Sequence, residues 1–154
     1  TELLEKFHLR KNKTVILSPY ANSFQEELSI IWWEQLAERI ENEGYIVATN
    51  CGSEKEKEIN GTNRLMISYR DFALVAELCG CIVGVRSGFF DLMSGINCKK
   101  IIIYQDFMSK ERADFFSLRN MELCEDAIEI KLDASPEGKE KLANRIISEM
   151  KGRR

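Results

Sequence analysis

The sequence predicts a single α/β domain in which a doubly wound parallel sheet carries helices on both faces. Short apolar runs typical of strands alternate along the chain with segments of helical periodicity. The length of 154 residues is that of one ordinary domain, and no internal repeat or low-complexity linker divides it. Because strands separated by helices pair in parallel through right-handed crossovers, we expect one sheet spanning residues 1–154.

The first third of the chain has the pattern of a βαβ unit. Residues 14–18 form a short β-type run, and Ser23 and Glu26 then have the spacing of a capping box, which predicts the start of a helix. The predicted helix repeats apolar residues at four-residue steps, which are Leu28, Trp32, Leu36 and Ile40. Gly44 is placed to end this helix, and residues 45–49 form the second strand.

The middle of the chain continues the alternation. Residues 50–63 are polar and charged and are predicted to form a loop, after which residues 65–67 form a short strand. Ser68 is a candidate N-cap for a helix over residues 72–78. Residues 81–85 are continuously apolar, which is typical of a central parallel strand covered on both faces.

The last third predicts two further strands and a closing helix. We expect a helix through residues 91–94 and a strand over 100–104, followed by helical or irregular structure over 109–120. Residues 127–132 form the last predicted strand, and Ser135 followed by a proline predicts the start of the final helix. The apolar face of that helix consists of Leu142, Ile146 and Met150.

The charge of the chain bears on its partners. The formal net charge is -3 and the acidic residues are spread out, whereas a general nucleic-acid binder has a concentrated basic face. We therefore expect no nucleic-acid partner. A phosphorylated small molecule remains compatible with this charge, because it needs only a few backbone N–H groups and one well-placed arginine.

The cysteines, the single histidine and the apolar runs indicate the cellular compartment and whether a metal site or membrane span is expected. The five cysteines are odd in number and contain no CxxC pair, so we interpret them as reduced, mostly buried and typical of a cytoplasmic protein. One histidine without ligand-like spacing predicts no metal site. No apolar run approaches the roughly 20 residues of a membrane span. The chain begins inside an apparent helix over residues 1–8, which suggests a piece of something longer.

Three predicted strand ends carry small or polar residues, at 18–23, 50–53 and 86–88. Ligands of open α/β sheets lie at the carboxyl ends of strands, so each is a candidate binding segment. The third is the most specific. Gly88 permits close approach to the backbone, Ser87 offers a hydroxyl, Arg86 could neutralise a phosphate, and the helix that follows favours an anion at its N-terminus. The alternative is that Ser87 is an ordinary N-cap and Arg86 lies on a solvated edge.

A resemblance to a known family covers roughly residues 14–104. Residues 74–91, LVAELCGCIVGVRSGFFD, resemble the C-terminal half of GT-B glycosyltransferases, of which the bacterial heptosyltransferases are the most similar type. In that half a helix and a strand precede an Asp-Ser-Gly-x-x-His signature that binds the diphosphate of the donor. The earlier Trp-x-x-Leu-Ala segment at 33–37, followed by Gly44, fits the same order.

The resemblance implies a Rossmann-like domain that binds a nucleotide-diphosphate sugar without a cofactor or metal. It implies that Ser87 and Gly88 contact the diphosphate and that Tyr69 and Arg70 lie near the base and ribose. The residues that would line the opposite wall are Ser18, Asn22 and Ser23.

Two residues depart from the family signature. Arg86 stands where the signature has Asp, and Asp91 stands where it has His. The first loop lacks the lysine that heptosyltransferases place near the phosphates, and Arg86 could supply that charge. Asp91 would then line the substrate site, or would act only as a first-turn acid that complements the helix dipole.

Three functions remain open from the sequence. The first is the donor-binding half of a glycosyltransferase, inactive alone and partnered by an N-terminal acceptor-binding domain. The second is a stand-alone enzyme similar to nucleoside deoxyribosyltransferases, in which Asp91 or Asp71 would be the nucleophile. The third is a non-enzymatic nucleotide-binding module. The length of the full reading frame separates the first from the other two.

Overall fold

Six parallel strands form one sheet in the order β3-β2-β1-β4-β5-β6, within the residues that the structure describes. The structure is a computed structural model that describes residues 2–20, 28–105, 117 and 127–152. The strands are β1 (Thr14–Ser18), β2 (Ile46–Asn50), β3 (Asn63–Leu65), β4 (Gly80–Val85), β5 (Lys99–Tyr104) and β6 (Ile128–Lys131). Every pairing between neighbouring strands is parallel, which confirms the predicted parallel sheet.

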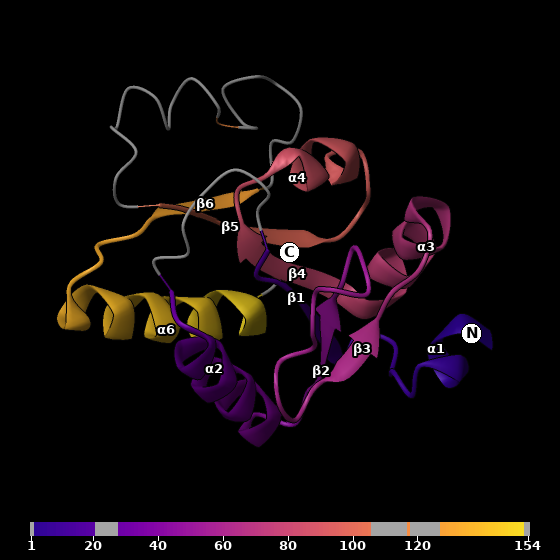
Figure 1. Ribbon diagram of the computed structural model, residues 1–154, viewed down its shortest axis with the longest axis horizontal. Coiled ribbons are helices and arrows are strands. Elements are labelled where there is room, and N and C mark those ends of the chain that lie inside the picture. The colour runs from indigo at the N-terminus through magenta and orange to yellow at the C-terminus, as the bar shows by residue number, and fades with distance from the viewer. Residues whose placement is uncertain (1, 21–27, 106–116, 118–126, 153–154) are drawn as a thin grey trace.

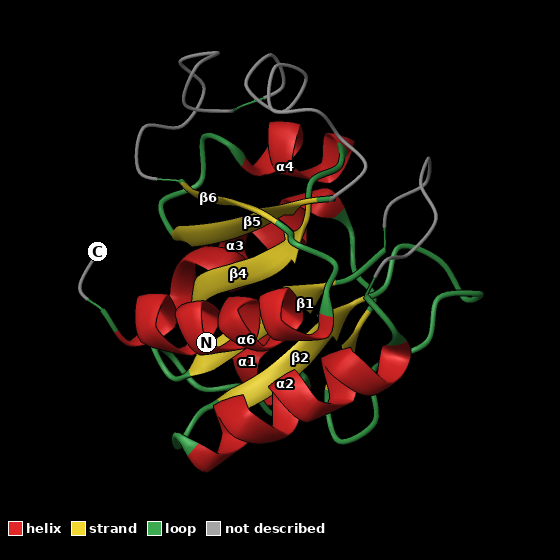
Figure 2. Ribbon diagram, turned by 90° about the vertical axis from the view of Figure 1, so that its left-hand side faces the viewer, coloured by secondary structure: helices red, strands yellow, loops and turns green. Residues whose placement is uncertain are grey.

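Helices cover both faces of the sheet, as the sequence predicts. They are α1 (Glu2–Lys6), α2 (Ile30–Asn42), α3 (Tyr69–Cys79), α4 (Gly88–Met93) and α6 (Pro136–Lys151). Helices α2 and α6 pack side by side on one face, and α1, α3 and α4 lie on the other (Figures 1 and 2). Among the described helices, none is both long enough and apolar enough to cross a lipid bilayer.

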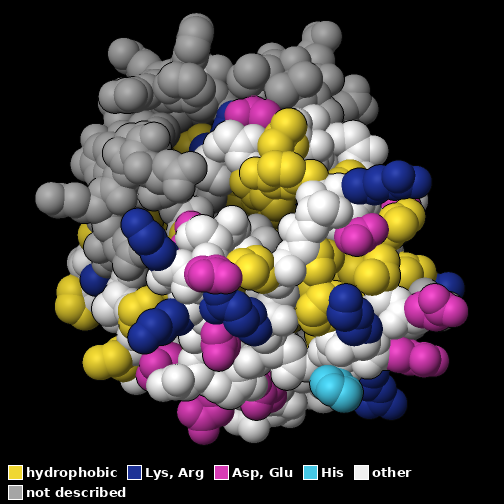
Figure 3. All heavy atoms as spheres, turned by 45° about the vertical axis from the view of Figure 1, so that its right-hand side comes forward, with side chains coloured by type: hydrophobic (Ala, Val, Ile, Leu, Met, Phe, Trp, Pro, Cys, Tyr) yellow, Lys and Arg dark blue, Asp and Glu magenta, His cyan; other side chains and the backbone are white. Residues whose placement is uncertain are grey.

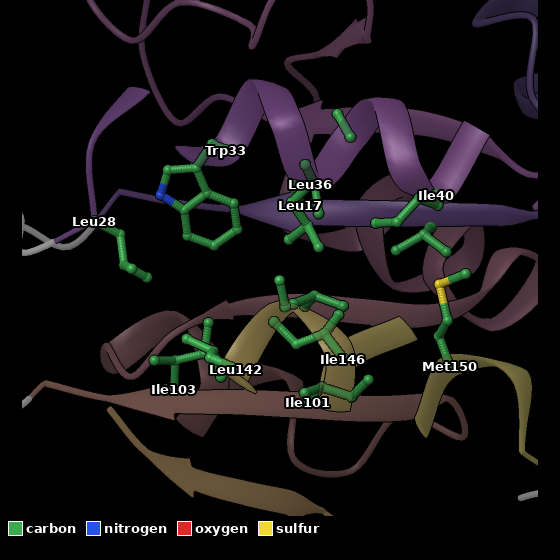
Figure 4. Close-up of a cluster of buried hydrophobic side chains, with 14 of the residues drawn as sticks. Leu17, Leu28, Trp33, Leu36, Ile40, Ile101, Ile103, Leu142, Ile146 and Met150 are labelled. Carbon is green, nitrogen blue, oxygen red and sulfur yellow. The ribbon is translucent and has the colours of Figure 1, made fainter. Parts of the chain in front are cut away.

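Each face of the sheet has its own apolar core because side chains alternate along a strand. On the α2/α6 face, Val83 and Val85 of β4 and Ile103 of β5 belong to one buried cluster with side chains of both helices. Figure 4 shows Trp33 and Leu36 of α2 pointing toward this cluster from one side, with α6 side chains on the other. The intervening residues, such as Ile82 and Ile102, join the α3/α4 core. The continuous apolar strands of the sequence therefore face helices on both sides.

Helix α2 differs from the sequence prediction at its start. Ser23 and Glu26, the predicted capping box, lie outside the described residues. Within those residues α2 begins at Ile30, and the Ser29 hydroxyl accepts a hydrogen bond from the backbone N–H of Trp32. The buried face is also shifted: Trp33 is 2% exposed, whereas Trp32 is only partly buried. The sequence places both tryptophans on or beside the apolar stripe and allows only one of them to face the core fully; the structure buries Trp33.

The other predicted elements are confirmed with boundaries shifted by a few residues. Gly80 ends α3 with φ 95° and Gly44 follows α2 with φ 90°, the left-handed conformation that favours glycine. Ser135 caps α6, whose first residue is Pro136. The predicted segment at 109–120 lies outside the described residues apart from Ser117. The four described cysteines are buried thiols that are not joined in disulfides, as expected.

Candidate functional site

The strand order locates the candidate site between β1 and β4. From β1 the chain winds outward through β2 and β3, and it then returns to the other side of β1 to form β4, β5 and β6. The loops that leave β1 and β4 therefore run to opposite faces and open a crevice at their carboxyl ends, where ligands of open α/β sheets bind. Ser18 is the last residue of β1, and Arg86 and Ser87 follow β4 directly.

Gly84 allows β1, β4 and α4 to approach one another closely at this point. It pairs with Ser18 in the sheet, and a Cβ at Gly84 would lie 2.5 Å from the Ser18 carbonyl oxygen and 3.1 Å from Cε2 of Phe90. Only glycine avoids these contacts. The buried Ser18 hydroxyl accepts a hydrogen bond from the side chain of Asn50, 3.3 Å away at the end of β2. Ser18 thus lines the edge next to β4 but already has one polar neighbour.

Helix α4 begins differently from the other capped helices. Hydroxyl groups of serine N-caps accept backbone N–H bonds at the starts of three helices, and these caps are Ser29, Ser68 and Ser135. Ser87 has the N-cap position of α4 but makes no such bond, and its buried hydroxyl has no partner in the described part of the chain. Gly88 is exposed, and a Cβ there would meet nothing within 4 Å. The first turn of α4 is therefore open to a ligand.

Arg86 is buried beneath this turn and forms an ion pair with Asp91. Its Nη2 lies 2.7 Å from Asp91 Oδ1, and its Nη1 donates to the Ser87 carbonyl oxygen at 2.5 Å. The Arg86 side chain is 9% exposed and that of Asp91 is 43% exposed. The interpretation of Arg86 as a solvated-edge residue is therefore wrong. The two residues that depart from the family signature contact each other.

A buried network extends this pair to β5 and β6. The Arg86 guanidinium donates to the hydroxyl of Tyr104, which in turn lies 3.3 Å from the Glu129 carboxylate. Burial, followed by the negative charge of Glu129, raises the pKa of Tyr104 above its ordinary value, so the phenol remains protonated at neutral pH. Arg86 thus connects the end of β4 both to the first turn of α4 and to the neighbouring strand.

Aromatic side chains lie beside the turn on the α3/α4 face. The Tyr69 ring, 62% exposed at the start of α3, lies 6.5 Å from the Phe89 ring between centroids. Phe89 also packs edge-on against Phe72 at 4.9 Å. Arg70 is exposed in the first turn of α3. Figure 3 shows this side of the molecule, where apolar side chains gather among charged ones. The structure thus brings the exposed Tyr69 ring next to Phe89 of α4.

The charged loop after β2 is more ordered than the sequence indicates. Arg64 of β3 donates to the carbonyl oxygens of Glu56 at 2.6 Å and Ser53 at 3.1 Å, and it forms an ion pair with Glu58 at 3.0 Å. The Tyr20 hydroxyl donates to the carbonyl oxygen of Lys57. No motif or periodic pattern in the sequence indicates a role for Arg64. Its role depends on a loop that folds back over the end of its own strand.

Two predicted site residues lie outside the described chain, and one buried polar residue was not predicted. Asn22 and Ser23 lie outside the described residues, so their place relative to Ser87 stays a prediction. Gln105, directly after β5, is a buried polar residue that the sequence analysis missed, because nothing in the run before it distinguishes a strand end from its continuation. Among the described residues, no three His, Cys, Asp or Glu side chains are grouped as metal ligands would be.

Comparisons with known proteins show the fold. No family model and no curated protein matches the sequence. Among solved structures, E. coli heptosyltransferase WaaC with ADP is similar at a TM-score of 0.66 and 13% identity, over 96% of this chain and 48% of that one. WaaC with ADP-2-deoxy-2-fluoro heptose matches at 0.66 and 12% identity, over 90% and 44%. This chain has the fold of a heptosyltransferase domain.

Two facts define how far this likeness extends. The chain spans about half the length of the WaaC chains it matches. A third structure, "Structure of MT0777", is similar at a TM-score of 0.58 and 14% identity, over 88% of this chain and 97% of that one. The same fold therefore also occurs in a chain of nearly this size. At these identities the comparisons establish the architecture, and the ligand is argued from the site.

Proposed function

We propose that this domain binds the diphosphate of a nucleotide sugar at the Ser87–Gly88 turn, as the donor-binding half of a glycosyltransferase. The observation that carries the proposal is the unfilled N-cap of α4 at the crevice between β1 and β4. Backbone N–H groups at a helix start favour an anion, and here no serine hydroxyl competes for them. The WaaC structures with ADP and an ADP-sugar have the same fold, which supports this ligand class.

The open space at Gly88 supports a close approach of the phosphates. A phosphate oxygen can reach the first N–H groups of α4 only where no side chain intervenes, and Gly88 provides that access. The Ser87 hydroxyl would donate a further hydrogen bond and so gain the partner that it lacks. Ser18 would form the neighbouring wall, and we keep Asn22 and Ser23 as proposed contacts on the same loop.

The proposed role of Arg86 differs from that of a cation that binds the phosphates directly. Its guanidinium already neutralises Asp91 and holds the Ser87 carbonyl oxygen, which orients the turn. We propose that it acts chiefly by positioning α4, with a smaller electrostatic contribution to the diphosphate because Asp91 offsets its charge. Asp91 is then a partner of Arg86 at the rim of the site.

The base and ribose are assigned to the aromatic surface beside the turn. Tyr69 presents an exposed ring next to α4, and a purine or pyrimidine could stack on it. Arg70, in the same helical turn, could contact the ribose or the first phosphate. Transfer to an acceptor would need a second, N-terminal domain, because the glycosyltransferases that this chain resembles build their active site between two halves.

A binding screen tests the proposal. Calorimetry with ADP, UDP, GDP and CDP should give a dissociation constant of about 1 mM or tighter for at least one of them, with the free base much weaker, because the phosphates make the charge-assisted contacts. Salt should weaken the complex, since the binding is electrostatic. Absence of binding by all four nucleotides would exclude the proposal.

The stand-alone nucleoside-processing enzyme remains the second candidate, favoured by the match to a whole chain of similar size. It needs a nucleophilic carboxylate, and Asp91 is the one at the site, 43% exposed and paired with Arg86. Incubation with deoxynucleosides and free bases separates the two candidates. Base release that is lost in Asp91→Asn, together with no diphosphate binding, would favour this second function.

A further inference from the structure

Gln105 carries a buried acceptor for which the described chain offers no donor. Its side chain follows β5 directly and is 6% exposed, and its Oε1 atom has no hydrogen-bond partner among the described residues. Buried amide oxygens in folded proteins are almost always hydrogen-bonded, because leaving one without a donor destabilises the fold. An unsatisfied buried acceptor at a strand end therefore points to a partner that arrives from outside.

The second such atom lies on the neighbouring strand end. Val85 pairs with Ile103 in the sheet, and Ser87 and Gln105 each stand two residues beyond that pair. The Ser87 hydroxyl and the Gln105 amide oxygen are the two buried side-chain atoms without partners among the described residues. Both therefore lie at the carboxyl edge of adjacent strands, and Ser87 belongs to the proposed diphosphate site.

The chemistry of the two atoms differs. A serine hydroxyl can donate to a phosphate oxygen, whereas an amide oxygen can only accept. A fully ionised diphosphate has no hydrogen to offer to Gln105. The partner that satisfies Gln105 must carry an O–H or N–H group, and a sugar is rich in such groups.

The order of the elements indicates which end of the ligand reaches Gln105. Gln105 follows β5, the strand beside β4 in the sheet, whereas Tyr69 begins α3 and packs against Phe89 of α4. A ligand with its base on Tyr69 and its phosphates at Ser87 would direct its far end toward Gln105. We propose that Gln105 accepts a hydrogen bond from a hydroxyl of the sugar attached to the second phosphate, an inference that rests on the proposed function.

The test compares each nucleoside diphosphate with its nucleotide sugar in the wild type and in Gln105→Met, which keeps the side-chain volume but removes the acceptor. The quantity measured is the ratio of the two dissociation constants for the same base. Gln105→Met should lower the preference for the sugar-bearing ligand about 3- to 10-fold, the usual effect of one neutral hydrogen bond. The matched control is Gln35→Met on the exposed side of α2, which should leave the ratio unchanged.

Thermal unfolding of the unliganded proteins gives an independent result. Gln105→Met should melt at the same temperature as the wild type or higher, because methionine does not bury an unsatisfied acceptor. A clearly lower melting temperature would show a structural amide and overturn the inference. A nucleotide-binding wild type whose ratio does not change in Gln105→Met would also overturn it, while the proposed function would stand. No diphosphate binding by the wild type would instead remove the proposed function, and the sugar contact with it.

Discussion

Two segments at the carboxyl edge of the sheet are each organised by one arginine, but at different depths. Arg64 holds the loop of residues 51–58, and its side chain is 31% exposed. Arg86 holds the turn of residues 86–91, and its side chain is 9% exposed. The first arginine bonds a surface loop to the strand that follows it, whereas the second is enclosed between α4 and the sheet.

The difference in burial between the two arginines predicts a difference in how much of the domain their removal destabilises. Arg64 contacts groups that are mostly solvated, so water can replace the guanidinium when it is removed. Arg86 contacts Asp91, the Ser87 carbonyl oxygen and Tyr104, which belong to α4, the turn and β5, respectively. Water has poor access there, so removal leaves unpaired polar groups. Loss of Arg64 should be a local event, and loss of Arg86 should destabilise the whole domain.

The largest effect is expected for Arg86→Met, which should lower the free energy of unfolding by about 2–3 kcal/mol. The value lies below that of a fully buried pair because Asp91 remains partly solvated. Urea denaturation at neutral pH measures it. An arginine in a solvated strand-end turn would behave differently, because its removal takes away no core volume and changes stability little.

A surface arginine provides the matched control for Arg86. Arg39 pairs with Glu140 at 3.5 Å between two exposed side chains, and Arg39→Met should cost less than about 1 kcal/mol. In the double variant Arg86→Met/Asp91→Leu the unpaired carboxylate is gone, so part of the lost stability should return. Equal destabilisation by Arg39→Met and Arg86→Met would show that depth does not separate them.

Alkaline pH should weaken the β4 region by a smaller amount. Burial raises the pKa of the Cys79 thiol from 9.0 to about 11 and that of Cys81 from 9.0 to about 12. A raised pKa stabilises the fold fully below the unfolded value, and this contribution is lost as pH rises toward the folded value. Each thiol should therefore cost about 1 kcal/mol of stability at pH 10. Denaturation at pH 8 and pH 10 measures this, and Cys81→Ala should flatten the dependence.

The smallest effect is expected for Arg64→Met, which should loosen the loop of residues 51–58 without changing the global melting temperature. Without Arg64, three acceptors of the loop lose the donor that they share: the carbonyl oxygens of Ser53 and Glu56 and the carboxylate of Glu58. Limited trypsin digestion should cut faster at Lys55 or Lys57, and the buried thiol of Cys51 in the same loop, which Arg64 contacts, should be alkylated faster. The buried Cys81 serves as the internal control, and an equal rise in its reactivity would contradict a local effect.

Acid should reproduce the local effect of that variant. A backbone hydrogen bond, assisted by Arg64, lowers the pKa of Glu58 below its ordinary 4.5. A lowered pKa gives a contribution that is present above the unfolded value and is lost as pH falls through the folded value. The rate of loop cleavage by pepsin should therefore rise as pH falls below about 4.5 in the wild type. In Arg64→Met this pH dependence should be weaker, and an identical dependence would exclude the Arg64 link.

The fold was predictable because its determinants are local. Periodicity placed each described strand and helix, and Ser68, Gly80 and Ser135 marked helix ends through side-chain and backbone preferences that act within a few residues. The start of α2 was not predictable in the same way. Ser23 and Glu26 have the spacing of a capping box but lie outside the described residues, whereas Ser29, which caps α2 at Ile30, has no Glu or Gln three residues later.

The candidate site was predictable only in outline. The Ser87–Gly88 turn followed from strand-end chemistry, but the pairing of Arg86 with Asp91 needed the geometry of the first turn of α4. The bonds of Arg64 to the loop of residues 51–58 and the orphan oxygen of Gln105 depend on long-range contacts or on their absence. No residue spacing in the sequence predicts the Arg64 bonds or the unpartnered Gln105 oxygen. The sequence does not show how deeply each arginine is buried, and burial decides whether an arginine binds a ligand, stabilises a surface loop or pairs with buried groups.

The central claim is that the diphosphate lies against the start of α4, and calorimetric titration of Gly88→Leu tests it most directly. A side chain at Gly88 has open space in the unliganded fold, so stability should not fall, but it would occupy the space of the phosphates. Gly95→Leu, equally open just beyond the other end of α4, is the control. With ADP, UDP, GDP or CDP, whichever the wild type binds, Gly88→Leu should weaken binding at least ~30-fold, roughly the loss of 2 kcal/mol of phosphate contacts. Equal affinities of the wild type, Gly88→Leu and Gly95→Leu would contradict the account.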